Sequence, residues 1–261
     1  IYLTEHEKSH ATIQKYVREL VWFLSFLQGE EPTKAKVLEY REQLQQSHHA
    51  RTVNAKLSAI HSYLDYLGLA ACKVRFLKIQ HTVFVDDSRD LTEAEYHRLL
   101  DAAKRKKDSR LYHVMLAICT TGIRVSELSF LTVEALHKGK AEIRMKGKIR
   151  TILLTKELCR KLNAYAKEKG IRTGYLFCTR TGKPLDRSNI CHDMKKLCRA
   201  ARVNPEKVFR HLFAKCYYAI KKNLAYLADI LGHASVDTTR IYVAMGTREH
   251  ERTLQRMHLI S

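Results

Sequence analysis

Helical spacing of apolar residues fills most of this chain, and one short segment of strict alternation interrupts it. The segment AEIRMKGKIRTILLT alternates apolar and polar residues on both sides of the Lys-Gly-Lys at 146–148. This pattern predicts two strands joined by a tight turn. The segment GYLFCTRTGKPL predicts a third short strand and turn. The sequence therefore predicts a mainly α fold with one small antiparallel β-sheet.

The helical segments fall into two blocks. Residues 1–75 predict a small, basic, all-helical domain of about four helices, and residues 76–90 have no helical periodicity and predict an extended linker. The second domain spans residues 91–261, and its first helix begins at a capping box formed by Thr92 and Glu95. In the first block, TIQKYVRELVWFLSFLQG places seven apolar residues on one broad stripe: Ile13, Val17, Leu20, Val21, Phe23, Leu24 and Leu27.

The charge balance indicates a polyanionic partner. The chain has 47 Lys+Arg against 27 Asp+Glu, a formal net charge of +20. Nucleic acid is the usual partner of such a chain, although a basic enzyme without a polyanion remains an alternative. The seven cysteines form no CxxC pair, which favours reduced thiols in a cytoplasmic protein. No apolar run approaches 18 residues and no signal-peptide pattern occurs, so we expect no membrane association.

Four segments of the second domain each contain a polar group in an apolar or tightly turned setting. Arg210 is the clearest case, because helical spacing places it on a face with Phe213, Ala214 and Tyr217. Taken singly, each of these groups has an ordinary structural explanation, such as an ion pair, a helix cap or packing. The segments are TTGIRVSEL with Arg124, RMKGKIR with Lys146, VFRHLFA with Arg210, and LGHASVDTTRIYV with His233 and Tyr242.

In this order, the four segments resemble the signature of the tyrosine recombinase family, also called the phage integrase or Xer-like family. TGIRVSEL matches the family pattern TGxRxSEL, and LGHASVDTTRIYV matches LGHxxxxTTxxYxx. The resemblance covers the whole chain, since family members join an N-terminal helical DNA-binding domain to a catalytic domain. It implies the two-domain clamp fold, with a SAM-like first domain and a helical tail after the catalytic domain.

The residue types suit phosphodiester chemistry. Cleavage places additional negative charge on the nonbridging oxygens, which the guanidinium forks of Arg124 and Arg210 can bind bidentately. Donors of this kind each lower the barrier by about 3–4 kcal/mol. The resemblance implies that Tyr242 attacks phosphorus and forms a covalent 3′-phosphotyrosine, that Lys146 protonates the leaving 5′-oxygen, and that His233 hydrogen-bonds the phosphate. We expect neither ATP nor metal, because the chain has no GxxxxGK[ST] loop and no suitable carboxylate cluster.

The resemblance also implies partners. They are double-stranded DNA with specific recombination sites, a homotetramer assembled on that DNA, and possible accessory proteins that bend DNA or set direction. The tail after Tyr242 predicts a helix that packs on a neighbouring subunit or folds back on its own domain. In the first domain, Arg51 and Lys56 of HHARTVNAKL are candidate phosphate contacts or parts of a solvated face. Such an enzyme is expected in the bacterial cytoplasm, associated with the nucleoid.

One position departs from the family. The family places a His three residues before its second Arg, and here that position is Lys207. Either Lys207 replaces the His, or about four residues are missing between Phe209 and Arg210. The second explanation is favoured, because relatives carry Pro-His-x-Leu between these residues.

Three functions are compatible with these motifs. The first is a site-specific recombinase that integrates or excises a mobile element or phage. The second is DNA relaxation of the type IB topoisomerase kind, and the third is a catalytically impaired DNA-binding regulator. The N-terminal helical domain and the full set of five polar residues favour the recombinase. The target sequence and the direction of the reaction are not encoded in any motif.

Overall fold

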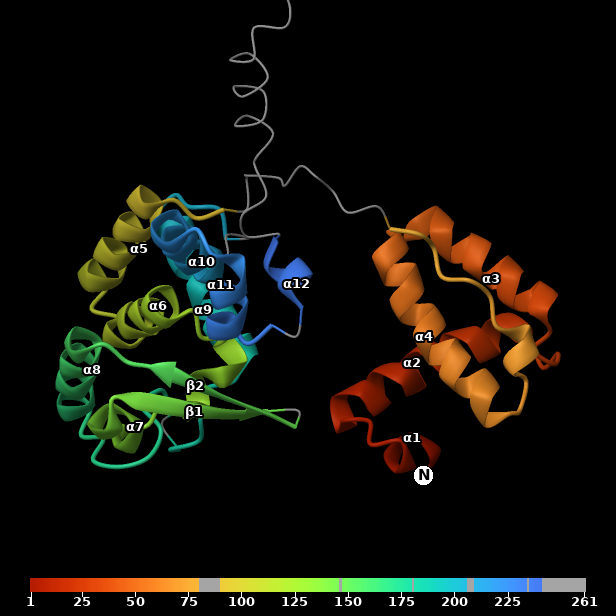
Figure 1. Cartoon of the computed structure of the whole chain (residues 1–261), viewed down its shortest axis with the longest axis horizontal. Coiled ribbons are helices and arrows are strands. Elements are labelled where there is room, and N and C mark those ends of the chain that lie inside the picture. The colour runs from red at the N-terminus through yellow and green to blue at the C-terminus, as the bar shows by residue number, and fades with distance from the viewer. Residues whose placement is uncertain (80–89, 146, 180, 206–208, 234, 241–261) are drawn as a thin grey trace, which may run out of the picture. The chain divides into compact units, whose positions relative to one another are not determined.

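The computed structural model describes the chain except for residues 80–89, 146, 180, 206–208, 234 and 241–261, and describes residue 148 only by its backbone. The chain divides into two units, residues 1–82 and 83–261, which are considered separately (Figure 1). Helices dominate both units, and the one sheet among the described residues is a two-stranded antiparallel hairpin. The predicted fold class is therefore confirmed. Of the sequence-predicted site residues, Lys146 and Tyr242 lie outside the described residues, as does Lys207.

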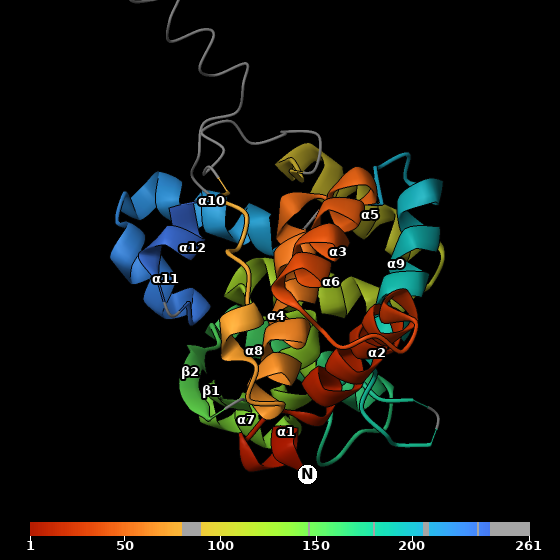
Figure 2. The same cartoon turned by 90° about the vertical axis from the view of Figure 1, so that its right-hand side faces the viewer.

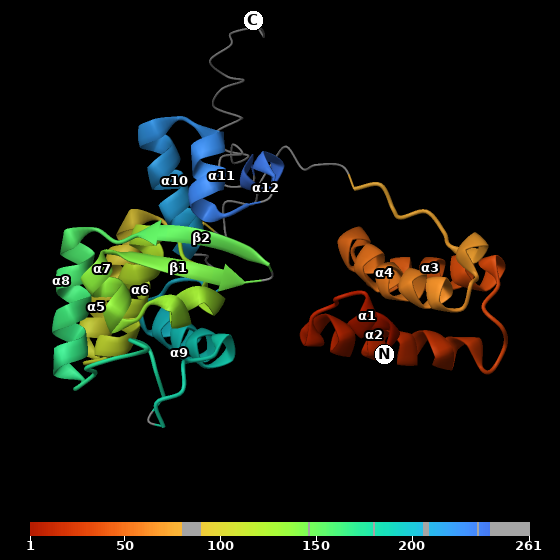
Figure 3. The same cartoon turned by 60° about the horizontal axis from the view of Figure 1, so that its bottom comes forward.

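The first unit is a small helical bundle. Helices α2 and α4 lie side by side (Figure 3), and Phe23, Val37, Leu57 and Ile60 are buried among the helices. Its helices are α1 (Tyr2–Glu5), α2 (His10–Leu27), α3 (Lys34–Ser47), α4 (Ala50–Tyr66) and the short 3-10 helix η1 (Ala70–Cys72).

The apolar stripe predicted for α2 is only partly buried. Phe23 and Leu27 lie in the core, whereas Val17, Val21 and Leu24 are between 45% and 58% exposed. The buried face of α2 instead includes Glu19. The stripe is broader than the contact with α4, so packing against α4 buries only one side of it.

The second unit is built around α6, which contacts α5, α8, α9 and α10. Helices α10, α11 and α12 form a group at one side of this unit (Figures 1 and 2). Its elements are α5 (Glu93–Arg105), α6 (Ser109–Thr121), the 3-10 helix η3 (Val125–Phe130), α7 (Val133–Lys138), β1 (Lys140–Met145), β2 (Lys148–Leu153), α8 (Lys156–Glu168), α9 (Arg187–Ala200), α10 (Phe209–Lys221), α11 (Leu224–Leu231) and α12 (Val236–Arg240).

Local signals placed several of these elements correctly. The capping box at the start of α5 is present, because the Thr92 side chain accepts from the Glu95 amide and the Glu95 carboxylate accepts from the Thr92 amide. The hairpin forms in the register that pairs Met145 with Lys148. The predicted third strand is absent from the described residues. Tyr175 makes an isolated bridge to Thr132, and the chain then turns back on itself with a second isolated bridge.

The two glycines of the predicted motifs end helices. Gly122 follows α6 and Gly232 follows α11, both in the left-handed region with φ of +65° and +63°. A Cβ on Gly122 would lie 2.7 Å from Phe213 Cε1, so α10 packs closely against this helix end. Phe209 and Arg210 are consecutive residues of α10. That residues are missing between them stays a prediction.

Candidate active site

Arg210 lies near the start of α10 and is 8% exposed. Its Nη1 donates to the carbonyl of Gly122, and its Nη2 donates to the carbonyl of Leu231 at 2.5 Å. These carbonyls are at the C-terminal ends of α6 and α11, where backbone acceptors have no partner within their own helix. The charged group on an apolar helix face is thus held by two helix ends.

Arg124 reaches the same place from the loop that follows α6. Its backbone amide donates to Glu127 Oε2 at 2.9 Å and its Nη1 donates to Glu127 Oε1 at 2.8 Å. Its Nη2 donates to the carbonyl of Gly232 at 3.3 Å. The short 3-10 turn of η3 brings Glu127 back to the residue three positions before it. Glu127 therefore orients Arg124 from three positions further along the chain.

A third arginine, Arg150, completes the cluster and was missed in the sequence. It lies on β2, and its Nη2 donates to Glu127 Oε2 while its Nη1 donates to the carbonyl of Ile230 at 2.6 Å. One signal could have identified it. Ile152, two residues further along the strand, is buried, so Arg150 has the strand parity that faces the core. A charge on a core face is the same anomaly that marks Arg210.

His233 lies between these arginines. Its Nε2 is 3.2 Å from Nη2 of Arg210, and its Nδ1 is 2.8 Å from the hydroxyl of the buried Thr239. A guanidinium only donates, so Nε2 accepts, and in the neutral ring Nδ1 carries the proton and donates to Thr239. Burial, followed by the positive charges of Arg210, Arg124 and Arg150, lowers the pKa of His233 to about 4.

Among the described residues, positive charge exceeds negative charge at this site. Burial alone would raise the pKa of Glu127, but its hydrogen bonds and ion pairs with Arg124 and Arg150 hold it below its ordinary value. Among the described residues, these interactions join one carboxylate to a group of three guanidinium ions with a neutral imidazole. Backbone carbonyls of Gly122, Ile230, Leu231 and Gly232 are further acceptors, and they orient the guanidinium groups without neutralising them. The arrangement is suited to binding an anion.

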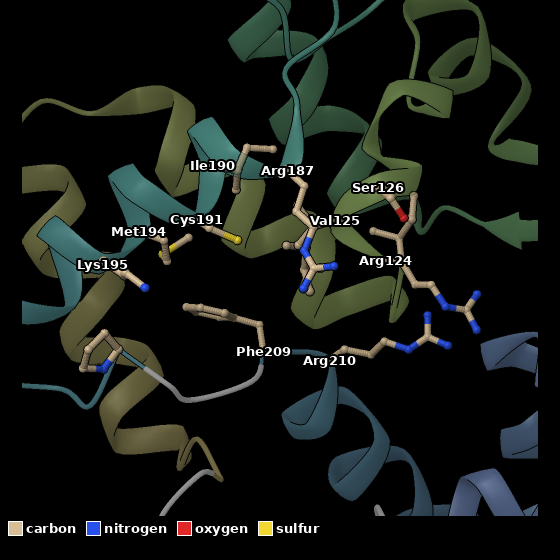
Figure 4. A pocket seen from close by; sticks show the side chains of 13 residues that line it. Arg124, Val125, Ser126, Arg187, Ile190, Cys191, Met194, Lys195, Phe209 and Arg210 are labelled. Atoms are coloured by element: carbon tan, nitrogen blue, oxygen red, sulfur yellow. The ribbon is translucent and has the colours of Figure 1, made fainter. Parts of the chain in front are cut away.

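A cavity of about 460 Å³ adjoins the cluster. Figure 4 shows that the guanidinium groups of Arg124 and Arg210 extend to the same side, whereas the Phe209 ring extends toward α9. The cavity wall is mainly apolar, and α9 contributes two cations to it, Arg187 and Lys195. Its lining includes Ile118, Ile123, Arg187, Ile190, Cys191, Met194, Lys195 and Phe209.

The structure brings together three of the five predicted site residues, Arg124, Arg210 and His233. In the first unit the two candidate phosphate contacts, Arg51 and Lys56, have different surroundings. Arg51 is exposed, but Lys56 binds the buried Glu19 at 2.6 Å and its side chain is only 18% exposed. Within the described ranges, no group of three or more His, Cys, Asp or Glu residues could hold a metal ion. No helix in the described part of the chain is long and apolar enough to cross a membrane.

Family models match both units. The model described as "Phage integrase family" matches residues 89–249, and "Phage integrase, N-terminal SAM-like domain" matches residues 1–70. Tyrosine recombinase XerA of Pyrococcus furiosus is 28% identical over 272 residues, covering 99% of this chain and 92% of the relative. The crystal structure of XerA recombinase has a TM-score of 0.54 at 25% identity and covers 100% of this chain and 96% of its own. Tn1549 transposon integrase, solved in complex with circular intermediate DNA, has a TM-score of 0.72 at 16% identity and covers 98% of both chains.

The chain belongs to the phage integrase family, the tyrosine recombinases. This membership confirms the resemblance that the motifs indicated. It also confirms the predicted activity, site-specific recombination of DNA by a DNA strand transferase.

Proposed function

We propose that this recombinase cleaves and rejoins DNA through a covalent 3′-phosphotyrosine, with Arg124 and Arg210 binding the scissile phosphate. The observation that carries the proposal is the convergence of Arg124, Arg210 and His233 from three separate segments. Carbonyls of Gly232 and Leu231 orient the two guanidinium groups, and Arg124 is also paired with Glu127, so among the described residues three guanidinium charges adjoin one carboxylate. A phosphate that gains negative charge in the transition state would be stabilised more than the resting phosphate.

His233 is proposed to donate a hydrogen bond to the same phosphate. In the resting arrangement Nε2 of His233 accepts from Arg210. When a phosphate oxygen replaces His233 as the acceptor for Arg210, the donor role requires the ring proton to reside on Nε2. The hydroxyl of Thr239 can donate or accept, and it therefore supports either tautomer of the ring. The negative charge of the phosphate would also raise the pKa of His233 and favour a protonated Nε2.

Tyr242 and Lys146 complete the proposed chemistry. Tyr242 gives up its phenolic proton to water as its oxygen attacks the phosphorus, the P–O5′ bond breaks, and Lys146 gives the departing 5′-oxygen its proton. The phosphotyrosine ester conserves the energy of the broken bond, so rejoining needs no ATP. Lys207 takes the sequence position where the family has a His, and we propose that this lysine also donates to a phosphate oxygen.

The experiment uses a suicide DNA substrate that carries a nick beside the cleavage position. The short fragment with the free 5′-hydroxyl then diffuses away after cleavage, so that rejoining cannot occur. A covalent protein–DNA adduct on a denaturing gel is the expected result, and Tyr242→Phe should abolish it. An adduct that survives Tyr242→Phe would refute the assigned nucleophile. A wild type that forms none would favour the DNA-binding regulator, and relaxation without exchange between two sites would favour the topoisomerase-like activity.

We further propose that the enzyme works as a homotetramer on two double-stranded DNA sites to integrate or excise a mobile element or phage. The net charge of +20 favours DNA binding that weakens as salt rises. The solved DNA complex of Tn1549 transposon integrase, which shares the fold, supports a DNA partner. Accessory proteins that bend DNA or set direction fit the same scheme, as does a place in the bacterial cytoplasm at the nucleoid.

A further inference from the structure

Arg150 connects three parts of the second unit. Its strand, β2, belongs to the hairpin, its Nη2 donates to Glu127 on η3, and its Nη1 donates to Ile230 in the last turn of α11. The Cδ and the guanidinium group of Arg150 lie directly against Gly232, where an added Cβ would be 2.9 Å from Nε and 3.4 Å from Cζ. One side chain thus contacts the hairpin, the turn that carries Arg124 and the turn that carries His233.

The contacts of Arg150 use the geometry of a guanidinium group. Its two terminal nitrogens point to two different acceptors, the Glu127 carboxylate and the Ile230 carbonyl. A lysine ammonium is a single point charge and cannot hold both acceptors in a fixed plane. The side chain is 14% exposed and its partner Glu127 is 4% exposed, so water does not readily replace either contact.

Glu127 depends on Arg150 as well as on Arg124. Its Oε1 accepts from the Arg124 side chain, while Oε2 accepts from both the Arg124 amide and Arg150. Without Arg150, one oxygen of a nearly buried carboxylate loses a charged donor, and the carboxylate can rotate toward whichever cation remains. The position of the Arg124 guanidinium would then be set less sharply.

We propose that Arg150 is a positioning residue that holds Glu127 and the turn at 230–233 together, so that Arg124 and His233 face the same phosphate. This inference rests on the proposed function, because the phosphate is the group for which the two side chains are positioned. Arg150 itself does not touch the reacting atoms. The turn needs a residue without a side chain at Gly232, because a Cβ there would displace Arg150.

The test compares wild type with Arg150→Met, Arg150→Lys, Glu127→Gln and the double variant Arg150→Met/Glu127→Gln. The readouts are the single-turnover rate of adduct formation at saturating DNA, the Kd for the same DNA, and the fraction of folded protein. Arg150→Met should slow adduct formation about 10–100-fold, the effect of a displacement near 1 Å in an active site. Its Kd should change less than threefold, and Arg150→Lys should recover only part of the rate.

The double variant tests the link to Glu127. If Arg150 acts through Glu127, the double variant should be no slower than the slower single variant. Both substitutions remove the same restraint on the Arg124 guanidinium. Additive effects would overturn the proposal. So would a rate per folded molecule within twofold of wild type in Arg150→Met, which would leave Arg150 with a purely structural role. If Arg150→Met does not fold, Arg150→Lys carries the same comparison, since it keeps the charge and loses the fork.

Arg144→Met is the matched control. Arg144 lies on β1 of the same hairpin, is 69% exposed and pairs only with Glu142 among the described residues. Its loss should leave the rate at saturating DNA unchanged, and a fall as large as that of Arg150→Met would overturn the proposal by showing that the hairpin's charge matters and not the contact.

The His233 ring provides a readout that does not need activity. Loss of one of the three facing charges should raise the pKa of His233 in Arg150→Met and not in Arg144→Met, as followed by NMR of the ring during a pH titration. An unchanged His233 titration would overturn the proposal. If wild type itself forms no adduct, the proposed function fails, and the titration still decides whether Arg150 shapes this cluster.

Discussion

Each unit of this protein buries a glutamate between two cations, and the two arrangements differ in what they leave over. In the first unit, Glu19 is 6% exposed and binds Lys56 at 2.6 Å and the exposed Arg18 at 3.3 Å. In the second unit, Glu127 is 3% exposed and binds Arg124 and Arg150. In both cases burial alone would raise the carboxyl pKa, but the adjacent cations hold the pKa below its ordinary value.

The difference lies in the other contacts of the cations. Among the described residues Lys56 has one carboxylate partner, so its ion pair joins α2 to α4 and orients no other group. Arg124 and Arg150 have donors left over, which they direct at carbonyls of Gly232 and Ile230. Arg210 adds a third guanidinium at the same helix end. A buried carboxylate can therefore stabilise packing, as in the first unit, or orient an excess of cations, as in the second.

The largest expected effect is at Arg210. Replacing it by Met should lower the rate of adduct formation about 10²–10³-fold, the usual loss when one preorganised donor to a transition state is removed. Single-turnover cleavage of the nicked substrate measures the rate, corrected for the folded fraction because Arg210 also binds two helix ends. Lys56→Met is the counterpart in the first unit and should leave that rate within about twofold. Equal losses of rate in Arg210→Met and Lys56→Met would contradict a difference in role between the two buried clusters.

The same Lys56→Met variant should instead lose stability. Removing one partner of a buried pair leaves the other charge less well satisfied, and we expect the first unit to lose about 1–3 kcal/mol of unfolding free energy. Urea unfolding followed by the fluorescence of Trp22, the one tryptophan of the chain, reports on this unit. A second substitution, Glu19→Leu, should restore most of the loss, since well-packed apolar residues often replace buried ion pairs without cost. A double variant less stable than Lys56→Met would contradict this account.

Gly232→Ala tests how closely the site is packed. Its Cβ would meet Arg150, whereas Gly170, with a similar φ of +69°, has nothing within 4 Å of an added Cβ. Both substitutions carry the strain of a left-handed alanine, about 1 kcal/mol. Only Gly232→Ala should also slow adduct formation, by about tenfold. Thermal melting and single-turnover rates of the two variants separate backbone strain from displacement of Arg150.

Thr239→Val removes the hydroxyl beside His233 at nearly constant volume. The ring then loses the partner of Nδ1, and we expect adduct formation to slow about fivefold to tenfold, in line with one lost hydrogen bond of about 1 kcal/mol. Thr239→Ser keeps the hydroxyl and should retain most of the rate. Equal rates for the Val and Ser variants would show that the contact does not orient the ring.

The smallest effect concerns pH. Because the pKa of His233 is about 4 in the folded protein and near 6.5 in an unfolded chain, the unfolded state binds the proton first as pH falls. The stability that the neutral ring contributes is therefore complete above pH 6.5 and declines toward pH 4. NMR of the His233 ring in the DNA-free protein should show no titration between pH 8 and 5. A midpoint near 6.5 would mean that the three arginines do not face the ring.

Some of these features were readable from local sequence. The Thr92–Glu95 capping box and the hairpin around residues 146–148 depend on contacts within a few residues, and each forms as predicted where the structure describes it. The glycine ends of α6 and α11 are local in the same way. Arg124 with Glu127 belongs to the same class, since the two are three positions apart. The motif order also identified the family, which the family models confirm.

Other features depend on segments far apart in the chain. Which side of α2 is buried, the pairing of Lys56 with Glu19 across 37 residues and the failure of a third strand to form follow from packing between elements. Strand parity marked Arg150 as anomalous, but nothing in the sequence names Glu127 and Ile230 as its acceptors.

The sequence by itself determined the helices and their ends, the hairpin, the basic charge and the identity of Arg124, Arg210 and His233 as candidate site residues. Only the tertiary structure decided that the ends of α6 and α11 present their carbonyls to those arginines and that Arg150 joins them. The physical reason is distance along the chain. Caps and turns satisfy hydrogen bonds among neighbouring residues, whereas a cluster of like charges forms only where folding brings its neutral acceptors and the Glu127 carboxylate to the same point.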